Sequence, residues 1–263
     1  MTDNTLVKYA KSGHVAVMTL DAPPANTYSF EMMQALDRCI LDARMDPEVQ
    51  VIVLTGQGEK FFCAGANIEM LQAADPTWKY YFCLHANETM CRLEQTPKLV
   101  IAAINGHCVG GGLEVALACD IRIARQGGGK IGLPEVKLGV LPGTGGTQRL
   151  ARLIGKAKAL EMMVEGDNYT FEEARDMGIV NKLFEGGDFM AEVMEYASRF
   201  TAPKTAAMAV GHIKRSVQAG AELPLGCGLE IEREFQAKLF ASEDAKEGLA
   251  SYNEKRSPSF RGC

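Results

Sequence analysis

The sequence predicts an α/β protein with a mainly parallel sheet, followed by a helical C-terminal region. Three short apolar runs rich in β-branched residues, at 51–55, 99–104 and 120–124, are typical of strands buried on both faces. Helical patterns separate these runs, which favours right-handed crossover connections between parallel strands. After about Thr144 the chain is mostly amphipathic helix, interrupted by glycine and proline.

The N-terminal part of the sequence predicts one strand and one helix. Residues 14–20 have the composition of a strand, and Pro23-Pro24 ends it. A helix is expected from about Phe30, because apolar residues recur on one helical face. The members of that face are Met33, Leu36, Ile40 and Leu41.

Residues 70–95 leave two interpretations open. They hold the only tryptophan, Trp78, among several aromatic and methionine side chains, without one clean helical stripe. Such a segment is either a mobile wall around an apolar ligand or an ordinary packed helix.

The chain divides near residue 200 into a core of residues 1–200, which would carry the active site, and a helical region of residues 201–263. Helices are expected at about 203–217 and 222–256. Their apolar faces need another surface to cover them, either a second copy of the chain or the core itself.

Composition excludes several classes of function. The net charge is -5 and the pI about 5.5, which argues against nucleic acid as a partner. The eight cysteines form no C-x-x-C pair and are expected to be reduced thiols in a cytoplasmic compartment. The four histidines are scattered without ligand spacing, so no metal site is expected.

The sequence also gives no sign of a membrane protein. Residues 1–4 have neither the basic start nor the apolar run of a signal peptide. No apolar stretch approaches the ~20 residues that a membrane span requires.

Two glycine-bearing turns are the first candidate functional segments. They cover residues 62–68 and 105–114, and the second carries Gly110-Gly111-Gly112 before a helical pattern. Two N–H groups that converge on one oxygen at such turns would form an oxyanion hole. Three glycines alone can equally serve only a tight turn. A nucleotide-binding loop does not fit, because the segment has neither G-x-G-x-x-G nor a G-K-[ST] ending. A nucleophile elbow does not fit either, because Glu114 rather than a serine follows the glycines.

Glu114 and Glu135 are the candidate catalytic carboxylates. Glu114 lies in the first turn of an apolar helix, where it could simply complement the helix dipole. Glu135 follows a second loop and, taken alone, could be a plain surface carboxylate. As a pair, they could act as acid and base on either side of one water molecule.

Several spaced motifs together resemble the signature of the crotonase (enoyl-CoA hydratase/isomerase) family. They are AGANI at 64–68, GGGLEVA at 110–116, CD at 119–120, LPE at 133–135, PGTGGTQR at 142–149 and the C-terminal EKRSPSF at 254–260. The resemblance implies a superhelix of stacked ββα units. It also implies a C-terminal helical trimerisation region, and assembly as a trimer or a dimer of trimers.

The resemblance implies a role for each matching position. Ala66 and Gly111 would supply the two oxyanion N–H groups, and Glu114 and Glu135 would hold the catalytic water. The positions implied to bind the CoA substrate are Ala25, Ala64 and Ile68 beside the adenine and pantetheine, Gly143 near the catalytic water, and Lys255 and Phe260 toward a neighbouring subunit's ligand.

The chain departs from the family pattern at two places near the ligand. The family commonly has Asp where this chain has Asn67, which changes hydrogen bonding near the adenine site. The turn at 21–26 lacks a basic residue that many members place against the CoA phosphates. The aromatic cluster at 78–82 would suit a wide or cyclic acyl group.

The implied activity is that of an enoyl-CoA hydratase, a hydro-lyase of the kind that serves fatty-acid β-oxidation. It would add water syn across the 2,3 double bond of a 2-enoyl-CoA. No separate cofactor is expected, because CoA is part of the substrate. The alternatives are a Δ3,Δ2-enoyl-CoA isomerase, a hydratase or hydrolase of a branched or cyclic acyl-CoA, and a non-catalytic CoA- or RNA-binding member.

Overall fold

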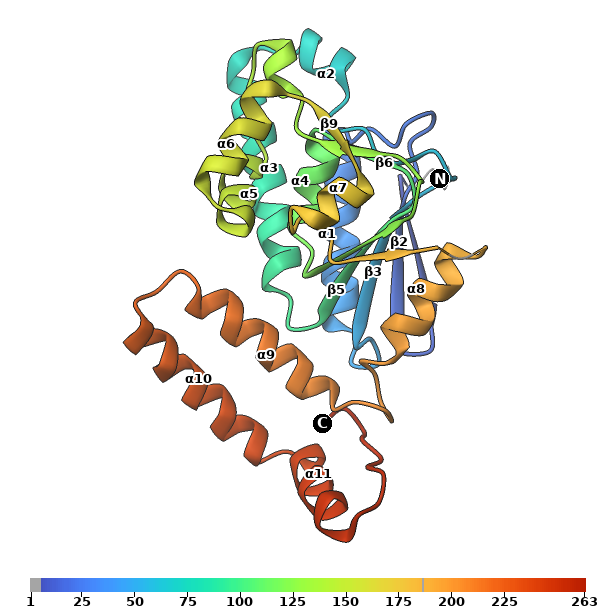
Figure 1. Cartoon of the computed structure of the whole chain (residues 1–263), viewed down its shortest axis with the longest axis vertical. Coiled ribbons are helices and arrows are strands. Elements are labelled where there is room, and N and C mark those ends of the chain that lie inside the picture. The colour runs from blue at the N-terminus through green and yellow to red at the C-terminus, as the bar shows by residue number, and fades with distance from the viewer. Residues whose placement is uncertain (1–5, 186) are drawn as a thin grey trace.

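A computed structural model describes residues 6–185 and 187–263. The N-terminal residues 1–4, on which the signal-peptide prediction rests, lie outside the described residues. Figure 1 shows a core of sheets and helices, with the helices of the C-terminal region extending away from it. The α/β class predicted from the sequence is confirmed.

The larger sheet is mainly parallel, as predicted. Its six strands have the order β1-β2-β3-β5-β7-β10, and only β1 and β2 pair antiparallel. They are β1 (Val7–Ser12), β2 (Val15–Leu20), β3 (Val51–Gly56), β5 (Leu99–Ile104), β7 (Ile121–Arg125) and β10 (Lys182–Phe184). Every residue of the central strands β3 and β5 is buried, which explains their continuous apolar sequences.

A second, smaller sheet lies beside the first. It contains β4 (Phe61–Cys63), β6 (His107–Val109), β8 (Lys130–Gly132) and β9 (Asn168–Thr170). Strands β4, β6 and β8 are parallel, so their carboxyl ends meet at one edge. Each of them follows a strand of the larger sheet, which produces the stacked ββα units that the resemblance implied.

This smaller sheet corrects the expected position of the glycine-bearing turns. The sequence placed them directly after the strands at 51–55 and 99–104. In the structure a three-residue strand, β4 in the first segment and β6 in the second, separates the strand of the larger sheet from the glycine turn. The segments at 64–67 and 110–111 therefore leave the small sheet side by side.

Helices cover the two sheets. They are α1 (Phe30–Met45), α2 (Ile68–Ala73), α3 (Pro76–Gln95), α4 (Gly111–Leu117), the 3₁₀ helix η1 (Glu135–Leu138), α5 (Gly146–Ile154), α6 (Lys156–Glu165), α7 (Phe171–Asp176) and α8 (Phe189–Ser198). Residues 70–73 belong to α2 and residues 76–95 form one regular helix, which confirms a helical structure for most of that segment. Phe82 and Cys83 of α3 also line an apolar cavity, so part of the segment is a cavity wall as well. Asp75 caps α3, and Trp78 stacks on Phe82 with ring centroids 5.4 Å apart.

Three helices make up the C-terminal region: α9 (Ala207–Gly220), α10 (Leu225–Phe240) and α11 (Glu243–Glu254). The single helix expected at 222–256 is therefore wrong. The helix ends before Ala241-Ser242, and a new helix begins there because the Ser242 hydroxyl accepts the N–H of Ala245. Helices α9 and α10 run side by side below the core (Figure 1).

The eight cysteines are free thiols. Cys39, Cys63, Cys108 and Cys119 are buried and act as small hydrophobic residues, as expected. The other four are partly or fully exposed. Within the described ranges, no helix is both long and apolar enough to cross a membrane.

Candidate active site

A mostly apolar cavity of about 420 Å³ lies at the carboxyl edge of the small sheet, under α2 and α3. Seven of the ten residues predicted for the site line it: Ala64, Ala66, Ile68, Gly111, Glu114, Glu135 and Gly143. The segments that follow β4, β6 and β8 supply Ala66, Gly111 and Glu135 respectively. The sheet geometry thus gathers residues that are far apart in sequence.

Ala66 and Gly111, whose backbone N–H groups the resemblance implied for the oxyanion hole, both line the cavity. A short parallel bridge fixes the Ala66 segment, in which Tyr28 N–H donates to Gly65 at 2.9 Å and Asn67 N–H donates to Tyr28 at 2.9 Å. Gly111 is the first residue of α4, where helical N–H groups lack internal partners. Across residues 6–185 and 187–263, neither N–H finds an acceptor, so both can bind a ligand oxygen.

Glycine is required in the turn that leads into α4. Gly110 has a φ of 57°, a left-handed conformation that other residues rarely adopt. At Gly111, an added Cβ would overlap the ring and hydroxyl of Tyr28. Gly110 and Gly111 therefore allow both the turn and the close approach of Tyr28 to the start of α4.

Glu114 is buried and held firmly. Its Oε1 accepts the N–H groups of Thr144 at 2.8 Å and Gly146 at 2.7 Å, and its Oε2 contacts the Thr144 hydroxyl. Burial raises the pKa of Glu114, whereas these hydrogen bonds and the positive charge of Arg149 oppose that rise. The surroundings therefore favour the ionised form more than burial alone would.

Glu135 lies in a different environment. Its Oε2 is buried and has no hydrogen-bond partner within the described part of the chain. Burial raises the pKa of Glu135 to about 7, and the negative charge of Glu114 contributes to the rise. Near neutral pH, Glu135 can therefore hold a proton and donate it.

The remaining predicted site residues lie outside this cavity. Ala25 contacts a residue that lines the cavity, because its carbonyl accepts the N–H of Ala64 at 3.0 Å. Lys255 ends α11, and the Phe260 N–H donates to Pro203 at 3.1 Å. A contact of Lys255 or Phe260 with a neighbouring subunit's ligand stays a prediction.

Sequence reasoning missed the residues that support Glu114. Thr144 and Gly146 lie in the PGTGGTQR run that the motif analysis quoted, but their role as donors depends on the fold. Tyr28 carries no signal in the sequence, yet it lines the cavity. Asn67, where the family commonly has Asp, caps α2 by accepting the Met70 N–H at 2.9 Å.

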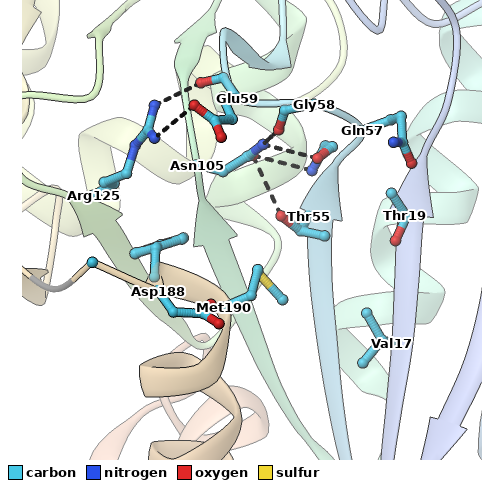
Figure 2. A pocket seen from close by; sticks show the side chains of 13 residues that line it. Val17, Thr19, Thr55, Gln57, Gly58, Glu59, Asn105, Arg125, Asp188 and Met190 are labelled. Atoms are coloured by element: carbon cyan, nitrogen blue, oxygen red, sulfur yellow. Dashed lines mark hydrogen bonds and ion pairs between the residues drawn. The ribbon is translucent and has the colours of Figure 1, made fainter.

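A second hollow, of about 380 Å³, lies above the ends of β2, β3 and β5 (Figure 2). Its polar groups mainly bind one another. Asn105 donates to the carbonyls of Gly56 and Gly58 at 2.8 and 2.6 Å, and Arg125 pairs with Glu59 at 3.6 Å. These contacts hold the ends of the larger sheet, and neither predicted carboxylate is among the lining residues.

The spiral of ββα units, with two carboxyl groups beside free backbone N–H groups, defines a crotonase-type enzyme. Comparison with known proteins is consistent with this class. A family model described as enoyl-CoA hydratase/isomerase matches residues 10–263. The chain belongs to the enoyl-CoA hydratase/isomerase family.

Several relatives resemble the chain over nearly its whole length. The short-chain-enoyl-CoA hydratase of Clostridium acetobutylicum is 37% identical, over 94% of each protein. The (E)-benzylidenesuccinyl-CoA hydratase of Thauera aromatica is 38% identical, over 96% of this chain and 97% of that protein. Relatives with hydratase names therefore include both a short-chain and an aromatic type.

Solved structures agree with the fold. An enoyl-CoA hydratase of Geobacillus kaustophilus matches with a TM-score of 0.96 and 44% identity, covering 100% of this chain and 98% of the other. An enoyl-CoA hydratase of Bacillus anthracis matches with a TM-score of 0.92 and 32% identity, covering 98% of this chain and 100% of the other.

Proposed function

We propose that this enzyme adds water syn across the 2,3 double bond of a 2-enoyl-CoA and forms a 3-hydroxyacyl-CoA. The observation that carries the proposal is the placement of Glu114 and Glu135 in one cavity, beside the N–H groups of Ala66 and Gly111. Hydration needs an acid, a base and a site for negative charge, and the cavity offers all three.

The N–H groups of Ala66 and Gly111 would bind the thioester oxygen. They stabilise the negative charge that develops there and make C3 of the enoyl group electrophilic. Ionised Glu114 accepts a proton from water as the water oxygen bonds to C3. Protonated Glu135 delivers its proton to C2. The cycle closes when Glu114 loses its proton and Glu135 regains one.

The acyl group would occupy the apolar part of the same cavity. Side chains of α3, including Phe82 and Cys83, form part of its wall. The names of the relatives include both a short-chain and an aromatic substrate, so the test uses crotonyl-CoA together with longer and cyclic enoyl-CoAs.

The test measures loss of the conjugated enoyl-thioester absorbance. Wild-type enzyme should hydrate at least one of these substrates, and Glu135→Gln should lower the rate by ~10²-fold or more. Glu59→Gln is the matched control, because that exposed carboxylate lies in the second hollow (Figure 2). Binding of CoA thioesters without hydration would refute the proposal, and a shift of the double bond would indicate isomerisation.

We also propose that the C-terminal region forms the interface of a homo-oligomer. Helix α10 has no buried residue in the isolated chain. Large apolar side chains are exposed along the three C-terminal helices, at Ile213, Val217, Leu225, Phe240, Leu249 and Tyr252. Apolar surface of this extent is expected to be covered by further copies of the chain.

A further inference from the structure

Two buried hydroxyl groups form a chain that ends on Glu114. The Tyr28 hydroxyl lies 3.0 Å from the Thr144 hydroxyl, which in turn contacts Oε2 of Glu114. All three residues are at most 3% exposed. They come from three separate parts of the fold: the segment before α1, the loop before α5, and α4.

The direction of these hydrogen bonds follows from the number of available protons. An ionised carboxylate only accepts, so the Thr144 hydroxyl must donate its single hydrogen to Glu114. The Thr144 oxygen is then left as an acceptor, and Tyr28 donates to it. Each bond polarises the next, which strengthens the contact at the carboxylate.

We propose that Tyr28 and Thr144 are positioning residues that keep Glu114 ionised and turned toward the water. This inference rests on the proposed hydration reaction. It explains how one cavity holds two glutamates in opposite roles: Glu114 receives hydrogen bonds on both oxygens, whereas Oε2 of Glu135 receives none within the described residues.

The charged and titratable groups around Glu114 do not replace this hydroxyl chain. Arg149 of α5 is the cation that acts on Glu114, and its charge is shared with Glu94, which it contacts at 3.0 Å. Lys79 of α3 also lines the cavity. The titratable groups whose charge couples to that of Glu114 are Cys83 of α3, Glu135 of η1 and Tyr28 itself. A negative charge on any of these three would oppose ionisation of Glu114.

The test compares kcat/KM against pH for wild type, Thr144→Val, Thr144→Ser and Tyr28→Phe. Loss of the Thr144 hydroxyl disfavours ionised Glu114, so the acidic limb should move about one pH unit higher in Thr144→Val. Tyr28→Phe should move it in the same direction by less. Thr144→Ser keeps a hydroxyl and should restore the wild-type position of the limb.

Thr55→Val is the matched control. Thr55 is also buried, and its hydroxyl donates to the Ala103 carbonyl at 2.9 Å, away from the cavity. Its loss should lower stability without moving the acidic limb. An equal shift in Thr55→Val, or unchanged limbs in both Thr144→Val and Tyr28→Phe, would overturn the inference. If Thr144→Val does not fold, Tyr28→Phe decides, because it removes only one oxygen.

A second measurement separates this inference from the proposed function. NMR titration of protein labelled with ¹³C at the glutamate carboxyls follows Glu114 directly, with Glu114→Gln identifying its signal. The Glu114 midpoint should rise in Thr144→Val and Tyr28→Phe even if no enoyl-CoA is hydrated. An unmoved midpoint would reject the hydroxyl chain, whatever the activity assays show.

Discussion

At the scale of single residues, the buried Glu135 carboxyl lowers the free energy of unfolding when it is ionised. Burial raises the pKa of Glu135 to about 7, whereas an unfolded chain holds glutamate near its ordinary value. The folded state therefore binds this proton more tightly. The cost is absent at low pH, grows as pH rises through the ordinary glutamate range, and is complete above about pH 7.

Glu135→Gln should therefore be more stable than wild type at pH 8, by about 1–2 kcal/mol once solvent screening of the partly exposed carboxyl is allowed for, and nearly equal to it at pH 4. Urea unfolding at both pH values measures the difference. The comparison with Glu59→Gln corrects for the general loss of one negative charge. A Glu135→Gln variant no more stable at pH 8 than wild type would contradict the raised pKa.

Gly111→Ala tests the contact between Tyr28 and the turn before α4. The added methyl group would overlap the Tyr28 ring, so the turn and its N–H must shift. Activity should fall by ~10²-fold or more through loss of the N–H donor. Stability should fall by about 1–3 kcal/mol through overpacking. Kinetics and urea unfolding provide the two values.

Gly187→Ala serves as the control for Gly111→Ala, because a methyl group at Gly187 meets no atom within 4 Å. It should leave both activity and stability close to wild type. Full activity in Gly111→Ala would show that the Gly111 N–H does not hold the thioester oxygen.

At the scale of elements, the sequence predicted strands best where both faces are buried. The strands predicted at 51–55 and 99–104 match β3 and β5, because a short, unbroken apolar run is typical of a strand buried on both faces. β1 was missed because all but one of its residues are partly or fully exposed. β4, β6 and β8 have three residues each, too few to show a period.

One ion pair holds α9 against the core. Lys214 Nζ lies 2.8 Å from Asp120 Oδ2, with side chains only 3% and 11% exposed. The same ammonium donates to the carbonyl of Lys98 at 3.0 Å, and Asp120 also accepts the N–H of Val100. The pair thus joins α9 to the strand β5 and the start of β7.

Lys214→Met should lower the free energy of unfolding by about 3–5 kcal/mol, because it leaves Asp120 buried without a counter-charge. Adding Asp120→Asn should recover part of the loss. Hydrogen exchange should show faster opening of α9 in the single variant. A loss below about 1 kcal/mol would show that the pair is dispensable.

At the scale of the whole molecule, the fold could be predicted because motifs far apart in the sequence matched one family in order. The site could be predicted only in part. Glu114 and Glu135 stand inside such motifs, whereas Tyr28 reaches Thr144 across 116 positions through the packing of the spiral. No local pattern encodes a contact of that range.

The assembly of the molecule is open to a direct test. Light scattering should give the mass of a trimer or of two trimers. Leu249 and Tyr252, three residues apart on α11, are 59% and 84% exposed, and changing both to Lys should lower the mass. Met45→Lys, at a residue 77% exposed on α1, is the control. A monomeric wild type would contradict the proposed interface.

The origin of the cavity in three successive ββα units has a consequence for folding. Ala66, Gly111 and Glu135 each follow a strand from a different unit, β4, β6 or β8. A chain in which only two units are wound correctly can have native-like secondary structure but cannot hydrate a substrate. Turnover during refolding therefore reports completion of the winding, and it should recover later than circular dichroism does.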